Sequence, residues 1–159
     1  MSDNEVLIAI APSLVRRWVA IFCLGLLGVL VISLVFSDAG GIWPVIFLAF
    51  GIGSILAADK FRRASADHIE LTREVLRTGS GRVLARIDNV ERVERGAFAF
   101  KPSNGFLVRL KAPDGKGWAP GLWWKRGKLL GIGGVIAGGQ TRAMADVMNA
   151  LIKGMLPED

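Results

Sequence analysis

The sequence predicts an α+β membrane protein, in which a hairpin of two transmembrane helices precedes a small antiparallel β domain with a C-terminal capping helix. Three features predict this fold: two long uncharged apolar segments near the N-terminus, a series of short alternating stretches separated by turns, and a final amphipathic stretch. Of the 159 residues, 52% are hydrophobic. The part after the apolar segments is long enough for one small domain with its own core.

The two apolar segments, residues 18–36 and 42–58, contain no charged side chain. At ~1.5 Å per helical residue they reach roughly 28 and 26 Å, close to the bilayer hydrocarbon thickness of about 30 Å. Pro44 falls in the first turn of the second segment, where its missing N–H costs nothing. We therefore expect a transmembrane hairpin over residues 18–58.

Basic residues flank the hairpin on one side only, since the short loop 37–41 holds no Lys or Arg. The positive-inside rule then places both termini in the cytoplasm and the loop outside. Residues 1–17 are expected as a cytoplasmic N-terminal segment, and 59–66 as a basic juxtamembrane linker. The expected topology determinants are Arg16, Arg17, Lys60, Arg62 and Arg63.

Small residues mark candidate helix-packing positions in both apolar segments. Ala49, Gly53 and Ala57 recur every four positions and form one stripe, while Gly25 and Gly28 leave a notch in the first segment. Helices in lipid associate through such close backbone approach. Two interpretations remain open: the stripe joins the two helices of the hairpin, or it docks a partner helix or a second copy of the chain.

Residues 67–159 show the period-two pattern of strands, interrupted by turn residues about every ten positions. This pattern favours an antiparallel sandwich or a partly open barrel. The stretch 88–95 is ambiguous and is interpreted as a turn that leads into a twisted strand. Strands are expected around 69–71, 83–87, 98–100, 106–110 and 118–124.

The end of the chain predicts an amphipathic helix over residues 141–155, with Thr141 as its N-cap. Covering an open face of the sheet is the simplest role for this helix, and docking on a partner is the alternative. The apolar stripe consists of Met144, Val147, Met148, Leu151, Ile152 and Met155.

The stretches 68–72, 86–93 and 104–108, with the closing helix and the two membrane helices, resemble the bacterial PH-like (pleckstrin-homology-like) membrane proteins. This resemblance implies a seven-stranded bent sheet plugged by a helix, used for protein interaction at the bacterial inner membrane. It implies no catalytic residue. The glycine-rich segment 127–139 departs from the family pattern and is expected as an elaborated loop.

Groups that catalyse reactions are sparse in this sequence. His68 is the only histidine and Cys23 the only cysteine, so no Cys–His pair and no zinc ligand set can be assembled. The glycines at 131–134 lack the remaining elements of a nucleotide-binding loop. We therefore expect no enzyme, no cofactor and no metal site.

Charge is the remaining signal, because the net charge is +6 and the basic excess follows the hairpin. A membrane-tethered basic domain meets anionic lipid more readily than nucleic acid, which is not expected as a partner. Trp123 and Trp124 are adjacent, so on a strand they must point to opposite faces. The alternative to a lipid or partner surface is therefore that one of these two tryptophans lies in the core of the sheet. The candidate lipid or partner surface is Trp123, Trp124, Lys125, Arg126 and Lys128.

These observations predict a non-enzymatic, membrane-anchored interaction protein, an accessory subunit or assembly factor of a larger inner-membrane complex. The alternative is a module that senses anionic lipids through its Trp/basic segment. The expected partners are the bilayer, other membrane proteins, anionic lipids and, in one interpretation, further copies of the chain.

Overall fold

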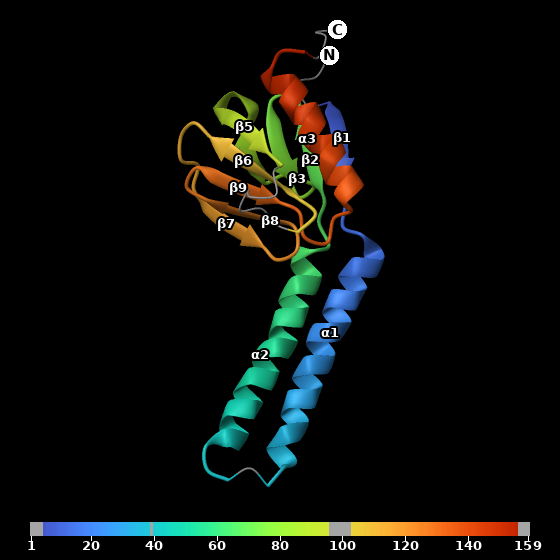
Figure 1. Ribbon diagram of the computed structural model, residues 1–159, viewed down its shortest axis with the longest axis vertical. Coiled ribbons are helices and arrows are strands. Elements are labelled where there is room, and N and C mark those ends of the chain that lie inside the picture. Colours follow the sequence, from blue (N-terminus) through green and yellow to red (C-terminus); the bar gives the residue numbers. More distant parts are fainter. Residues whose placement is uncertain (1–4, 39, 96–102, 156–159) are drawn as a thin grey trace.

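The computed structural model describes residues 5–38, 40–95 and 103–155. Two long helices extend from one end of a β-rich domain and are joined at their far end by a short loop (Figure 1). The domain contains two antiparallel sheets and a C-terminal helix, so the mixed α+β class predicted from the sequence is confirmed.

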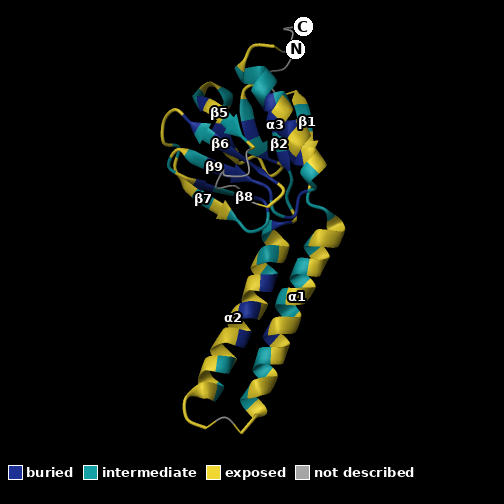
Figure 2. Ribbon diagram, in the orientation of Figure 1, coloured by how far each residue is buried: buried dark blue, intermediate teal, exposed yellow. Residues whose placement is uncertain are grey.

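The hairpin consists of α1 (Leu14–Ser33), a short 3₁₀ turn η1 (Leu34–Phe36) and α2 (Trp43–Ala64). Both helices are long and apolar enough to cross a membrane, and most of their side chains are exposed (Figure 2). Each extends beyond its expected boundary on the domain side. The expected linker 59–66 is helical up to Ala64, so α2 enters the domain without a flexible joint.

A strand before the hairpin belongs to the β domain, although residues 1–17 were expected to form a separate N-terminal segment. β1 (Val6–Ile10) pairs antiparallel with β2 (Ile69–Thr72), and Ile10 lies opposite Ile69. The side chain of Ile10 is only 1% exposed and belongs to the core. The domain is therefore built from segments on both sides of the hairpin.

The remaining strands complete two sheets. The first has the order β1-β2-β3-β4, and the second has the order β5-β6-β9-β8-β7, so β9 returns between β6 and β8. A short 3₁₀ turn, η2 (Ile87–Asn89), leads into the second sheet, as the stretch 88–95 suggested. The strands are β3 (Val75–Thr78), β4 (Val83–Arg86), β5 (Val90–Glu94), β6 (Phe106–Leu110), β7 (Lys116–Ala119), β8 (Trp123–Arg126) and β9 (Leu129–Ile132).

Two expectations for the second sheet were wrong. The single strand expected at 118–124 is divided between β7 and β8, because the chain turns at Gly121 with a positive φ of 81°. The glycine-rich segment 127–139 is not a loop throughout, since its apolar residues form β9 and pair with β6 and β8. The strand expected at 98–100 lies outside the described residues.

The C-terminal helix α3 (Gly138–Ile152) packs against β1, β5 and β6 and so covers the gap between the sheets (Figure 1). It begins earlier than expected, and Thr141 lies within it. The Thr141 hydroxyl donates to the backbone oxygen of Asn104 and does not cap the helix. Met144 and Met148 are buried in the core, whereas Met155 lies beyond the helix and is 70% exposed.

The two sheets and α3 share one hydrophobic core. The described residues form two sheets and no closed barrel. They form nine strands, where the PH-like resemblance implies seven.

Candidate functional site

The hairpin closes through two glycines. An added Cβ at Gly28 would lie 2.9 Å from the backbone oxygen of Gly51 and 2.7 Å from a side-chain carbon of Ile55. The reverse holds at Gly51, where an added Cβ would lie 2.9 Å from the oxygen of Gly28. The backbones of α1 and α2 therefore meet at this crossing, as small residues allow in lipid. Gly28 was predicted from the sequence as a helix-packing position, whereas Gly51 was not.

The stripe of Ala49, Gly53 and Ala57 is exposed along α2 and turned away from this crossing. An added Cβ at Gly53 would meet no atom within 4 Å, and the same is true at Gly25. The interpretation that the stripe joins the two helices of the hairpin is therefore wrong. Docking of a partner helix or a second copy stays a prediction.

Two of the expected topology determinants, Arg16 and Arg17, fix the start of α1 in place. The Arg16 guanidinium donates to the backbone oxygen of Ile136 at 3.2 Å, and Arg17 donates to that of Arg62 at 2.9 Å. The backbone N–H of Ser13 also donates to Val135 at 2.9 Å. The N-terminal end of α1 is thus fixed both to α2 and to the segment that precedes α3.

The basic residues at the end of α2 have partners of their own. Arg62 and Arg63 each form an ion pair with Asp59 at 2.8 Å. The ammonium of Lys60 lies over the ring of Trp118, 4.9 Å from its centroid. This cation–π contact joins α2 to β7.

Four of the five residues of the predicted Trp/basic surface lie on β8 and are divided between its two faces. Trp123 is buried in the core with the Arg82 guanidinium 4.9 Å from its ring centroid, whereas Trp124 points to the other face. Lys125 is also buried, so it is not a surface residue. Its ammonium donates to the backbone oxygen of Leu84 at 3.0 Å and to the carboxylate of Asp114 at 3.1 Å.

Lys125 therefore joins the two sheets, because Leu84 belongs to β4. Alternation along a strand already places Trp123 and Lys125 on one face and Trp124 and Arg126 on the other. The sequence did not indicate which of these two faces points to the core. Of the five predicted surface residues, Arg126 and Lys128 are exposed and Trp124 is half-buried.

A pocket of about 580 Å³ lies beside Trp124, and we call it the tryptophan pocket. Its lining is mostly apolar, with one charged side chain, Arg126. Gly121 is at its edge and faces the Phe61 ring of α2, since an added Cβ there would lie 2.7 Å from that ring. The lining residues are Trp118, Ala119, Gly121, Leu122, Trp123, Trp124, Arg126, Leu129, Gly133 and Gly134.

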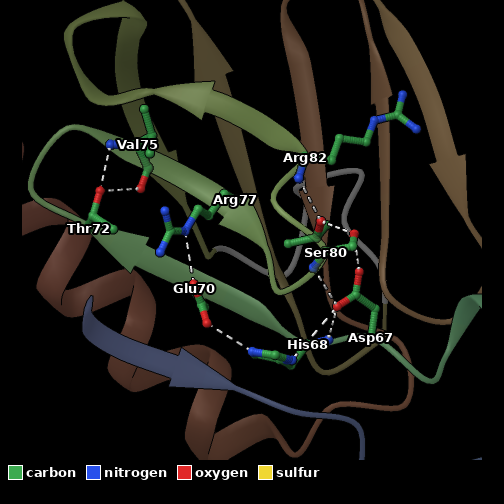
Figure 3. A network of polar contacts seen from close by, with 9 residues as sticks. Asp67, His68, Glu70, Thr72, Val75, Arg77, Ser80 and Arg82 are labelled. Atoms are coloured by element: carbon green, nitrogen blue, oxygen red, sulfur yellow. Dashed lines mark hydrogen bonds and ion pairs between the residues drawn. The ribbon is translucent and has the colours of Figure 1, made fainter. Parts of the chain in front are cut away.

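A polar network follows the end of α2 at the start of the first sheet (Figure 3). The Ser80 hydroxyl donates to the Asp67 carboxylate at 2.7 Å. The Glu70 carboxylate lies 2.9 Å from Nε2 of His68 and accepts from Arg77 at 2.9 Å. His68 therefore pairs with Glu70 in this network.

The network lowers the pKa of both carboxyl groups. Burial raises the pKa of Asp67, but hydrogen bonds from the Ser80 hydroxyl and from the backbone of His68 and Ser80 outweigh it, and the net direction is downward. Hydrogen bonds from His68 and then Arg77 lower the pKa of Glu70. The folded chain therefore favours the ionised form of both groups.

Acid is expected to destabilise the domain through these two carboxylates. Their pKa values are lower in the folded than in the unfolded chain, so their stabilisation is complete above the unfolded values of about 4 and is lost as the pH falls through the folded values. The free energy of unfolding, measured in detergent between pH 6 and pH 3, should decrease on acidification. The double substitution Asp67→Asn with Glu70→Gln should flatten this dependence, and an unchanged pH slope would contradict the assignment.

Comparisons with protein-family models, curated proteins and solved structures found no match to this chain. Among the described residues, no three His, Cys, Asp or Glu side chains are grouped so that they could hold a metal ion. The features that distinguish this chain are thus its apolar hairpin, the fixed junction with the β domain, and the tryptophan pocket beside that junction.

Proposed function

We propose that this chain is a non-enzymatic membrane protein whose hairpin anchors a PH-like β domain at the cytoplasmic face of a bacterial inner membrane. There it acts as an accessory subunit or assembly factor of a larger membrane complex. The observation that carries this proposal is the double attachment of the domain, through β1 before the hairpin and β2 after it. Such a domain is held at a fixed position beside the hairpin, as suits presentation of a binding surface.

The exposed stripe on α2 supports a partner within the membrane. Ala49, Gly53 and Ala57 have no role in the α1–α2 crossing, and their small side chains permit another helix to approach closely. The basic residues at the domain end of both helices support a cytoplasmic position for the domain. The PH-like assignment is supported by the two antiparallel sheets and the closing helix.

Gly53→Leu is expected to release a partner helix while the chain stays in the membrane, because the new side chain would block close approach without touching α1. The measurement is purification of the tagged chain in a gentle detergent, followed by native sizing and mass spectrometry. Gly25→Leu is the matched control, since it adds the same side chain at an equally open position of α1.

A stoichiometric membrane complex that is lost in Gly53→Leu and kept in Gly25→Leu would support the proposal. A chain that purifies alone from membranes under these conditions would contradict the role of accessory subunit. Extraction of the chain from membranes by alkaline carbonate would contradict the anchor itself.

A further inference from the structure

We propose that the tryptophan pocket binds an anionic phospholipid from the bilayer in which the hairpin lies. This inference rests on the proposed membrane anchoring and adds a ligand site to it. In the bound arrangement, the phosphate pairs with Arg126. The glycerol and the first carbons of the acyl chains lie against Trp124 and Trp118, toward the end of α2.

The tryptophan pocket lies close to the end of α2. β7 and β8 are the strands of their sheet that lie nearest to α2 (Figure 1). The turn between them places Gly121 against the ring of Phe61, in the last turns of α2. The Lys60 ammonium lies over the Trp118 ring at the same junction. The pocket therefore lies close to the point along α2 where its apolar part ends.

The lining of the pocket combines indole, aliphatic and basic side chains. Trp118 is 61% exposed although its ring is apolar, and indole rings concentrate at the interface between hydrocarbon and water. Leu129 adds an aliphatic side chain to the lining. Arg126 brings a planar guanidinium, whose paired N–H groups match the oxygens of a phosphate. The described lining contains this positive charge and no carboxylate.

The arrangement of charge and apolar surface favours a lipid over a soluble anion. Strand β8 runs from the turn beside α2 to Arg126, so the tryptophan side of the pocket connects the helix end to the guanidinium. A free phosphate would pair with Arg126 and leave the apolar wall in water. A phospholipid fills both parts, and its chains continue into the bilayer beside α2.

The test uses the full chain in bilayer nanodiscs, with Trp18→Phe and Trp43→Phe as background. These two exposed tryptophans lie in the hairpin, and their replacement leaves Trp118, Trp123 and Trp124 as reporters. Brominated acyl chains quench indole fluorescence on contact. The quenching by brominated phosphatidylglycerol is compared with that by brominated phosphatidylcholine at equal content.

We expect stronger quenching by the anionic lipid, and a roughly fivefold weaker preference for it in Arg126→Gln, as one basic contact to lipid implies. Lys128→Gln is the matched control, because it removes the same charge at an exposed position between β8 and β9, outside the pocket lining. It should retain the preference. Leu129→Glu should abolish the preference, since it places a carboxylate inside the pocket.

Equal quenching by the two lipids would overturn the proposal. An equal loss in Arg126→Gln and Lys128→Gln would also overturn it, because general attraction between charges would then explain the binding. Resistance of the same chain to alkaline carbonate extraction is measured in parallel. A resistant chain without lipid preference refutes the pocket alone, whereas an extracted chain refutes the anchoring.

Discussion

A fragment that begins at residue 67 is expected not to fold, although it contains the whole C-terminal part of the domain. It lacks β1, which pairs with β2 and supplies Ile10 to the core. Loss of a buried isoleucine side chain alone costs about 2–5 kcal/mol, and the unpaired edge of β2 adds to this. Since a whole domain is stable by only about 5–15 kcal/mol, the fragment should show no cooperative unfolding transition in urea.

The matched control keeps β1 and removes only the hairpin. Pro12 and Ser65 line the same small cavity, so their ends can be joined by a short Gly/Ser linker that replaces residues 14–64. This shortened chain is expected to unfold cooperatively, with dispersed amide signals in its NMR spectrum. If the fragment from residue 67 were as stable as the linked chain, β1 would be dispensable.

Gly28→Leu is expected to disrupt the hairpin, because the new side chain has no space at the helix crossing. An added Cβ there already lies 2.9 Å from the backbone oxygen of Gly51, which cannot move without moving α2. Overpacking of this kind costs about 1–3 kcal/mol or more. Unfolding of the full chain by increasing SDS in mixed micelles, followed by far-UV circular dichroism, should shift to lower SDS content.

Gly53→Leu serves as the control for this prediction, since an added Cβ at Gly53 meets nothing within 4 Å. Its unfolding should resemble that of the unsubstituted chain. Equal destabilisation by the two substitutions would mean that the hairpin does not close at Gly28 and Gly51.

The apolar hairpin, the antiparallel β domain and the closing helix were all predictable, because each depends on a pattern within a short segment. The hydrophobic period identified α3 and placed Met144 and Met148 on its buried face. Length and the absence of charge identified α1 and α2. Both signals are local and need no knowledge of how distant segments meet.

Contacts between distant segments were not predictable in this way. β1 is a five-residue apolar stretch, and its partner lies beyond the whole hairpin. Lys125 was assigned to the surface from its charge, yet the backbone oxygen of Leu84 and the carboxylate of Asp114 accept hydrogen bonds from it in the interior. Gly51 was overlooked because the four-residue spacing of Ala49, Gly53 and Ala57 was the stronger pattern. Ala49, Gly53 and Ala57 do follow this spacing on α2, but they face away from α1.

The position of β1 ahead of α1 has a consequence for biogenesis. The first strand leaves the ribosome before either helix, but it can pair with β2 only after α2 has been synthesised. If the hairpin spans the bilayer as proposed, β1 and β2 lie on the same side of the membrane only when α1 crosses it in one direction and α2 crosses it back. A chain with one helix misinserted would leave β1 across the membrane from its partner. The first sheet can therefore be completed only in a correctly inserted chain. In a misinserted chain the core would remain exposed to proteases.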